Sequence, residues 1–200
     1  MFWDKISVVY DLFENVYNRR VYNGTGKNVA EYMSESDEVL ECACGTGAIS
    51  VYIAPKCKKL IATDYSAGML KKAKKKCAKY GNVNFSNADI TDLKYNDASF
   101  DKVVAGNVIH LLPQPDKALN ELMRVVRPGG LVIIPTYINM SRKNGRIAVS
   151  FMKKLGADFK KEFDLDSYKE FFKNLGYDDV EYAVVDGRMP CAIAAITKRQ

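Results

Sequence analysis

The sequence alternates short apolar runs with amphipathic stretches, and this alternation constrains the fold more than any other feature. Apolar runs of about five residues are typical of strands buried on both faces, whereas apolar residues three or four positions apart are typical of helices. Strands that are separated by helices of roughly 10–15 residues indicate parallel pairing, because each helix carries the chain back to the edge where the next strand starts. The pattern therefore predicts an α/β protein with a parallel, doubly wound sheet.

The predicted elements follow in chain order. Strands are expected at 38–43, 60–64, 83–86, 100–105, 131–137, 180–185 and 191–197. Helices are expected at 4–20, 25–34, 47–55, 66–80, 115–126 and 166–175. A turn is expected at 127–130, where the sequence reads Arg-Pro-Gly-Gly. Only a short Asp-Gly-Arg connection joins the last two strands, so these two must be antiparallel and the sheet mostly parallel.

Composition and charge narrow the function classes. No apolar run approaches the roughly 18 residues of a membrane span, and the N-terminus lacks a signal pattern, so we expect a cytoplasmic protein without a membrane span. The five cysteines are scattered and have no partner at zinc-ligand spacing, which favours small buried thiols and no metal site.

The net charge is +6, and much of the excess lies in the run KKAKKKCAK at 71–79. A basic patch can bind nucleic acid or an anionic membrane. The same stretch carries an apolar stripe at helical spacing, which favours a solvated amphipathic helix. The stripe consists of Met69, Leu70, Ala73, Cys77 and Tyr80.

The stretch ECACGTGAIS, residues 41–50, carries the first sign of a ligand site. Gly45 and Gly47 let the backbone turn sharply into a helix and approach a ligand closely. Asp64 ends the next predicted strand, where an acid can hold ribose hydroxyls. Ser50 stands where a dinucleotide-binding GxGxxG loop has its third glycine, so the stretch fits a single-nucleoside cofactor better than a dinucleotide. The pair Gly47 and Asp64 by itself does not separate NAD from other nucleosides.

Further segments follow in a fixed order: VLECACGTG, IATD, NADITDL, FDKVVAGNVIHLL and LNELMRVVRPGGLVII. With these motifs the chain, from about residue 10 to 137, resembles the class I S-adenosylmethionine (SAM)-dependent methyltransferases, in the small-molecule branch that includes ubiquinone and menaquinone biosynthesis (methyltransferase type 11). The resemblance implies a Rossmann-like sheet of seven strands with the last one antiparallel. It also implies SAM as cofactor, S-adenosylhomocysteine as product, and in-line transfer of a methyl group to a small-molecule acceptor.

The resemblance also implies cofactor-binding roles for particular residues. The methionine part of SAM would face Glu41 and the glycine loop, the ribose would face Asp64, and the adenine amino group would face Asp89. The full set implied is Tyr10, Glu41, Ala43, Gly45, Gly47, Asp64, Tyr65, Met69, Asp89, Ile90 and Asn107. Ala43 departs from the family, which usually has glycine there. We expect a negative φ at Ala43, and a positive φ would indicate that the loop is misaligned.

His110 is the only histidine and follows the fourth predicted strand closely, so we consider it as a catalytic base, with a packed histidine as the alternative. We expect a single domain over 1–200, in which a helical cap at 1–35 and an insertion at 138–165 roof the acceptor pocket. A small-molecule acceptor is the expected partner rather than a nucleic acid.

Three other functions stay open on the sequence. An NAD(P)-dependent oxidoreductase would use the glycine turn and Asp64 but would leave Asp89 without a role, and Tyr168 is followed by Phe172 rather than by the lysine of a Tyr-x-x-x-Lys pair. A non-catalytic SAM-binding protein and an RNA methyltransferase are the remaining alternatives. The acceptor atom can be carbon, oxygen, nitrogen or sulfur.

Overall fold

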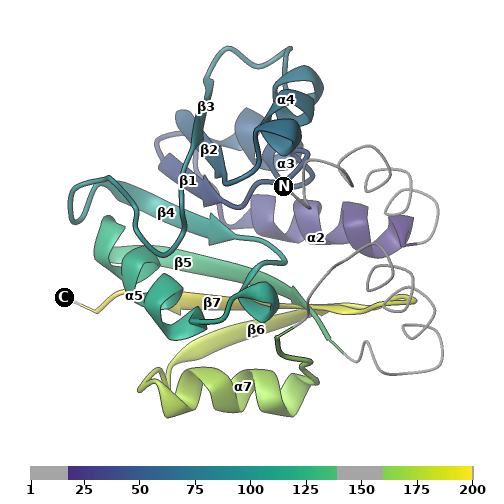
Figure 1. The fold of residues 1–200 in the computed structure, drawn as a ribbon, viewed down its shortest axis with the longest axis vertical. Helices are drawn as coiled ribbons and strands as arrows, with labels where there is room; N and C mark the ends of the chain where they lie inside the picture. The colour runs from purple at the N-terminus through teal and green to yellow at the C-terminus, as the bar shows by residue number, and fades with distance from the viewer. Residues whose placement is uncertain (1–17, 139–159, 200) are drawn as a thin grey trace.

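The computed structural model describes residues 18–138 and 160–199, and its centre is one seven-stranded sheet with helices on both faces (Figure 1). The strand order is β3-β2-β1-β4-β5-β7-β6. The strands are β1 (Glu38–Cys42), β2 (Lys59–Asp64), β3 (Val83–Asn87), β4 (Phe100–Ala105), β5 (Val126–Tyr137), β6 (Val180–Val185) and β7 (Cys191–Thr197).

The first five strands are parallel to one another, and β7 is antiparallel to both of its neighbours. The last strand in the chain is inserted between β5 and β6, with its register running from Leu131 opposite Thr197 to Tyr137 opposite Cys191. The predicted fold class, a doubly wound and mostly parallel sheet of seven strands with an antiparallel last strand, is confirmed.

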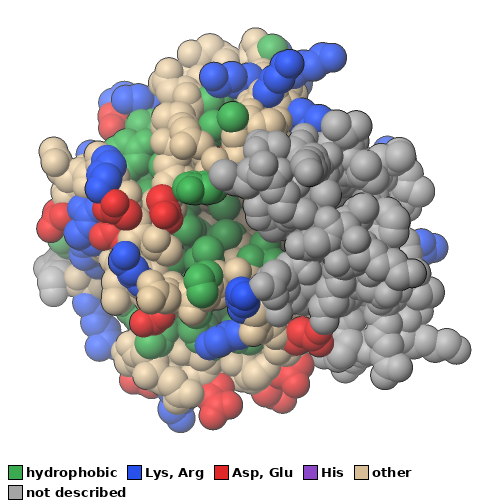
Figure 2. Space-filling view, viewed as in Figure 1, with side chains coloured by type: hydrophobic (Ala, Val, Ile, Leu, Met, Phe, Trp, Pro, Cys, Tyr) green, Lys and Arg blue, Asp and Glu red, His purple; other side chains and the backbone are tan. Residues whose placement is uncertain are grey.

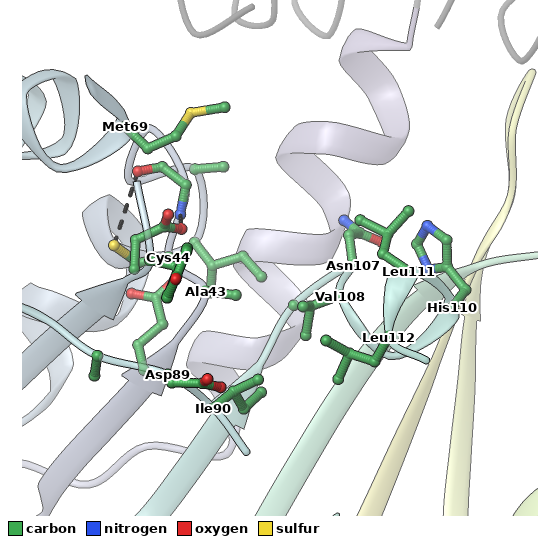
Figure 3. A pocket seen from close by; sticks show the side chains of 18 of the residues that line it. Ala43, Cys44, Met69, Asp89, Ile90, Asn107, Val108, His110, Leu111 and Leu112 are labelled. Atoms are coloured by element: carbon green, nitrogen blue, oxygen red, sulfur yellow. Dashed lines mark hydrogen bonds between the residues drawn. The ribbon is translucent and has the colours of Figure 1, made fainter. Parts of the chain in front are cut away.

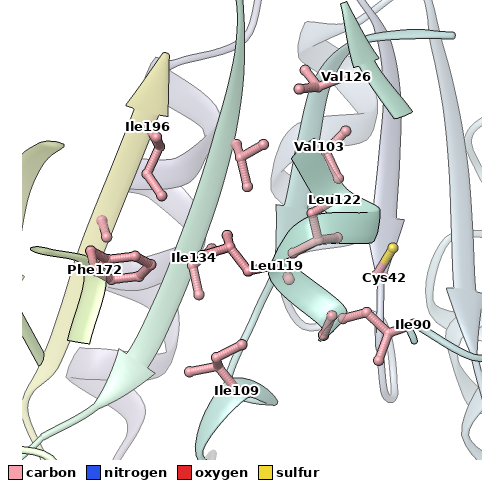
Figure 4. Close-up of a cluster of buried hydrophobic side chains, with 14 of the residues drawn as sticks. Cys42, Ile90, Val103, Ile109, Leu119, Leu122, Val126, Ile134, Phe172 and Ile196 are labelled. Carbon is pink, nitrogen blue, oxygen red and sulfur yellow. The ribbon is translucent and has the colours of Figure 1, made fainter. Parts of the chain in front are cut away.

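Alternation along each strand divides the core between two layers. On β5, Val132 and Ile134 pack on one face and Ile133 packs on the other. The first face is covered by α5 (Pro115–Val125) and α7 (Leu165–Asn174), whose buried side chains join the cluster in Figure 4. Because both faces are covered there, β7 and the Leu131–Ile134 part of β5 read as continuous apolar runs.

The opposite face is covered by three helices: α2 (Arg19–Glu31), α3 (Ser50–Ile53) and α4 (Ala67–Lys76). Two short 3-10 turns, η1 (Ala54–Lys56) and η2 (Ile109–Leu111), complete the elements. In the described part of the chain no helix combines the length and the apolar character needed to cross a membrane.

Several predicted boundaries are wrong. The helix expected at 25–34 starts earlier and runs from Arg19 to Glu31, and the helix expected at 4–20 falls almost entirely outside the described residues. The helix expected at 47–55 begins only at Ser50, because Gly47 has a left-handed φ of 82° that cannot continue a helix. The lysine-rich helix has the expected N-cap, since the Ser66 hydroxyl accepts from the Met69 amide, but it ends at Lys76.

The turn predicted at 127–130 is also wrong, because these residues belong to β5. A Cβ atom on Gly130 would lie 2.6 Å from the carbonyl oxygen of Asp101 on β4, so glycine lets the two backbones approach. The register between β4 and β5 shifts at this point, between Phe100 and Lys102. The glycine pair therefore makes an irregular strand start rather than a reversal of the chain.

Candidate functional site

A cavity of about 420 Å³ lies at the edge of the sheet where β1, β2 and β4 end (Figure 3). It is lined from the segments that follow β1, β2, β3 and β4, from the end of β5, and from the connection between β6 and β7. In a doubly wound sheet ligands bind at the carboxyl ends of the strands, beside the point where the strand order reverses, which here lies between β1 and β4.

The loop after β1 passes along one end of the cavity. Ala43 has a φ of +53°, so the expectation of a negative φ is wrong, and a positive φ is the value expected of a misaligned loop. Ala43 nevertheless lines the cavity, and the next amide, of Cys44, donates to the carbonyl of Thr63 at 2.8 Å. The left-handed conformation of Ala43 directly precedes this tie to β2, and it costs a residue with a Cβ roughly 1–2 kcal/mol.

The carboxylate of Asp64 is fixed by two backbone amides. Its Oδ2 accepts from the Gly45 amide at 2.8 Å, and its Oδ1 accepts from the Ser66 amide at 2.8 Å. Gly45 itself has a φ of +54°, and a Cβ there would meet nothing within 4 Å, so conformation rather than space favours glycine. The glycine loop and the acid at the end of β2 therefore form one hydrogen-bonded unit that faces the cavity.

Glu41 is buried at the floor of the cavity, and its carboxyl accepts a 2.5 Å hydrogen bond from the hydroxyl of Ser50. Burial raises the pKa of Glu41 to about 8, against the opposing effect of the Ser50 hydrogen bond and with a smaller upward effect from the Asp64 charge. The serine at the position of the missing third glycine thus has a direct role, because it supplies the partner of this buried acid.

Asp89 lies beyond β3, with Ile90 beside it at the same wall. Its Oδ1 accepts from both the amide and the hydroxyl of Thr91 at 2.8 Å, which fixes the direction of the carboxylate. Arg124 on α5 holds the following loop by donating to the carbonyls of Leu93 and Tyr95.

Asn107 follows β4 with a φ of +53°, and its amide donates to the carbonyl of Pro135 at 2.8 Å. Its side-chain oxygen is buried, and no described residue donates to it. Figure 3 shows Asn107 between the loop of Ala43 and the turn that carries His110. A buried acceptor without a donor at a cavity wall is a place where a ligand can donate a hydrogen bond.

Figure 3 shows His110 of η2 near Leu111 and Leu112, on the side of the cavity away from Met69 and Asp89, and we call this side the apolar end. Tyr137 at the end of β5 and Met189 also line the cavity. His110 is 2% exposed, and burial lowers its pKa to about 4, so its imidazole is neutral at neutral pH. The backbone of Met189 is bound to the side chain of Asn18, which donates to its carbonyl at 3.1 Å and accepts from its amide at 3.3 Å. This pair ties the start of α2 to the connection between β6 and β7.

Ten of the twelve residues singled out from the sequence line this one cavity. They are Glu41, Ala43, Gly45, Asp64, Tyr65, Met69, Asp89, Ile90, Asn107 and His110. Gly47 is not among the lining residues, and a Cβ there would lie 3.2 Å from the Ala73 Cα, so this glycine serves the packing of α4. Tyr10 lies outside the described residues.

Other lining residues carry no signal in the sequence. Met189 is contributed by a connection far along the chain, and Thr46 and Ile49 come from the glycine loop without any pattern of their own. The predicted roof at 1–35 and 138–165 falls largely outside the described residues and stays a prediction. The described helix of that region, α2, packs against α3 and the β6–β7 pair.

Comparison with known proteins gives concordant matches. Residues 40–134 match the family model described as a methyltransferase domain. A demethylmenaquinone methyltransferase of Clavibacter sepedonicus is 35% identical over 136 residues, covering 66% of this chain and 55% of the relative. The ubiquinone/menaquinone biosynthesis C-methyltransferase UbiE of Bdellovibrio bacteriovorus is 34% identical over 141 residues, covering 66% of this chain and 58% of the relative.

The chain thus spans a little over half the length of these two relatives. Among solved structures, a SAM-dependent methyltransferase of Thermotoga maritima, described as a possible histamine N-methyltransferase, matches with a TM-score of 0.75. That match covers 99% of this chain and 98% of the other at 18% identity, and at this identity it supports the fold alone.

Proposed function

We propose that this chain, which matches a methyltransferase domain over residues 40–134, is a class I SAM-dependent methyltransferase of the small-molecule branch and transfers a methyl group from SAM to a ring carbon of a quinone-type molecule. The observation that carries the proposal is that the fixed carboxylates of Asp64 and Asp89 and the imidazole of His110 line the same cavity. The acceptor class is supported by the names of the two relatives, a demethylmenaquinone methyltransferase and a C-methyltransferase of quinone biosynthesis.

The residues present fit such a cofactor. The volume of about 420 Å³ lies within the usual range of ligand pockets, roughly 300–1,000 Å³. The carboxylate of Asp64 is held in place by backbone amides at the end of β2, and the buried oxygen of Asn107 lacks a donor among the described residues. These acceptors match a ligand that brings ribose hydroxyls and an ammonium group.

We assign the binding roles accordingly. Asp64 would accept from the ribose hydroxyls, and Asp89, with the Ile90 backbone beside it, would accept from the adenine amino group. Tyr65 and Met69 would pack against the nucleoside, and Glu41 would lie toward the methionine part. When bound, SAM supplies a methyl group that is already activated on its sulfonium.

The protein then has to align the acceptor and exclude water. The apolar end of the cavity suits a flat ring, because Leu111 and Leu112 offer apolar surface near His110, and Tyr137 and Met189 add apolar lining to the cavity. A ring carbon that gains a methyl group must lose its proton, and the neutral imidazole of His110 at this end of the cavity can accept it or hydrogen-bond to a ring hydroxyl. We also propose a cytoplasmic location, which suits five free and buried thiols.

Calorimetric titration with SAM, S-adenosylhomocysteine and NAD tests the cofactor. We expect saturable binding of the first two, and Asp64→Asn should weaken it at least about tenfold, since a hydrogen bond to a charged group contributes about 1.5–3 kcal/mol. Asp92→Asn, which alters an exposed carboxylate paired with Lys94, is the matched control and should leave the affinity unchanged. Binding of NAD without binding of SAM would contradict the proposal.

Transfer of a labelled methyl group tests the reaction. We expect the label on a ring carbon of a chemically reduced demethylated quinone. We expect no labelled phenol ether as product and no label on thiols or RNA. A protein that binds SAM with the expected dependence on Asp64 but labels none of these acceptors would be a binding protein rather than an enzyme.

A further inference from the structure

The charge of this chain is concentrated in one part of the fold. Of its 30 lysines and arginines and 24 acids, nine lysines and one acid, Asp64, lie between Cys42 and Ala88, which leaves 21 basic and 23 acidic residues elsewhere. The segment forms α3, β2, α4 and β3 at one end of the sheet. Figure 2 shows lysine and arginine side chains gathered at the end of the molecule that carries α4.

On α4 the lysines form a row with no counter-charge on the helix. Lys71 and Lys75 are four residues apart, which places them on one side of the helix, and Lys74 is exposed beside them. Like charges at this spacing destabilise a helix by roughly 0.2–0.5 kcal/mol per pair. Lys79 is also exposed and lies three residues past the end of the helix at Lys76. We name these four residues the lysine face.

No carboxylate in the described part of the chain pairs with Lys71, Lys74 or Lys75. The nearest acid in sequence, Asp64, accepts from two backbone amides and faces the cavity. Lys76 is different from the lysine face, since it is half-buried and donates to the hydroxyls of Tyr22 and Thr46. The lysine face is therefore available to an anionic partner.

The lysine face begins beside the mouth of the cavity. Met69, on the first turn of α4, and Tyr65, just before the helix, both line the cavity. Tyr65 is 58% exposed, the highest value among the large apolar side chains described, so the cavity opens to solvent at this point. An exposed tyrosine next to lysines is typical of segments that lie at a membrane surface.

We propose that the lysine face docks this protein on anionic phospholipid bilayers, from which its acceptor is drawn. The choice of partner rests on the proposed function, since a quinone with an apolar tail dissolves in the bilayer rather than in water. Lysines near an anionic leaflet contribute about fivefold each to the affinity. Nucleic acid is disfavoured because residues 42–88 contain no arginine, and Tyr65 is the one tyrosine of this range that is exposed for stacking on a base. Tyr52 and Tyr80 are half-buried, with their hydroxyls hydrogen-bonded to Asn23 and Val51.

Sedimentation with phosphatidylglycerol vesicles and with phosphatidylcholine vesicles tests this, with no SAM or acceptor present. We expect the protein to bind the anionic vesicles and to lose that binding as salt rises. The triple variant Lys71→Gln, Lys74→Gln, Lys75→Gln should bind them on the order of 100-fold more weakly. The control variant Lys117→Gln, Lys169→Gln, Lys173→Gln loses the same charge from exposed positions on α5 and α7 and should bind as the wild type does.

Three results would overturn the proposal: equal binding to both vesicle types, an equal loss in the control variant, or tighter binding to a mixed-sequence duplex RNA than to anionic vesicles. SAM titration of the same variants keeps the two proposals apart. A triple variant that loses vesicle binding but keeps the wild-type SAM affinity supports docking by the lysine face. A wild type that binds vesicles but not SAM contradicts the proposed function, and with it the reason for drawing the acceptor from the bilayer, but not the docking itself.

Discussion

At the scale of single residues, the buried carboxyl of Glu41 makes stability depend on pH. Its pKa is raised from 4.5 to about 8, so the folded state keeps a proton that the unfolded chain releases. The unfolded state then binds fewer protons, and the free energy of unfolding falls as pH rises from about 4.5 toward 8, by up to about 1.4 kcal/mol per pH unit from this group.

Glu41→Gln keeps an acceptor for Ser50 but cannot titrate, so it should remove this slope. Urea unfolding of both proteins across that pH range measures it, with the exposed Glu35→Gln as a control that keeps the wild-type slope. Parallel slopes for Glu41→Gln and the wild type would show that Glu41 releases its proton in the folded state.

The imidazole of His110 gives a second prediction at this scale. Burial lowers the pKa of His110 to about 4. The pH profile of kcat/KM should therefore contain no step near pH 6.5 that belongs to His110, so the wild type and His110→Asn should have the same profile shape in that range. Loss of a proton acceptor should lower kcat about 10²–10⁴-fold while the SAM affinity stays unchanged. A kcat within about twofold of the wild type would assign His110 to packing alone.

Residue types predicted the site better than residue conformations. Asp64 was recognisable as an acid that ends a strand shortly after a glycine turn, Asp89 through the family resemblance, and His110 as the only histidine, soon after the fourth strand. All three line the cavity. The φ of Ala43 was not recognisable. Its left-handed value depends on the hydrogen bond from Cys44 to Thr63 on the neighbouring strand, which no local pattern reports.

At the scale of elements, Gly26 lets α2 pack closely against α3. A Cβ at this position would overlap the ring of Tyr52, whose hydroxyl is bound to Asn23 and limits the movement of the ring. Gly26→Ala gains about 1 kcal/mol of helix propensity but should lower the free energy of unfolding by about 1–3 kcal/mol through overpacking.

Urea unfolding checks this against Gly81→Ala, where a Cβ meets nothing within 4 Å and the change should stay within about 0.5 kcal/mol. A stabilised Gly26→Ala protein would mean that α2 shifts away from α3 at little cost.

Strand positions were predicted more accurately than helix ends. β4, β6 and β7 have the predicted bounds. β7 is marked by apolar residues along almost its whole buried length, whereas β4 and the partly exposed β6 combine β-branched or aromatic residues with charged ones. The helix that starts after Ser66 was expected to continue to residue 80, because its apolar stripe continues past the point where the backbone leaves the helix at Cys77. Amphipathic spacing records which side faces the core, and it does not record where the hydrogen bonds stop.

At the scale of the whole molecule, ligand binding should raise thermal stability by mass action. SAM at about 100 times its Kd stabilises the folded state by about 2.7 kcal/mol, which for a protein of this size raises Tm by roughly 5–10 °C. Differential scanning calorimetry measures the shift. Asp64→Asn should show a smaller shift at the same SAM concentration, and an equal shift with NAD would contradict a site built for a single nucleoside.

The sheet as a whole followed from the alternation of apolar runs and helices, because the connection rules leave few topologies open. The composition of the site did not follow in full. Asn18 and Met189 are 171 positions apart, and their paired hydrogen bonds, which fix one wall of the cavity, exist only once the chain has closed on itself. Such contacts between distant, chemically unremarkable residues leave no periodic signal.

The insertion of β7 between β5 and β6 has a consequence for how the protein is made. In a growing chain that has not yet emerged as far as Cys191–Thr197, the edge of β5 that faces β7, along Leu131 to Tyr137, has no partner, and β6 has no neighbour to join. Such an open edge is a template for pairing with other chains. The sheet can therefore be completed only after its final strand has left the ribosome, and a product truncated before Cys191 is expected to aggregate or be degraded rather than to persist as a partly folded domain.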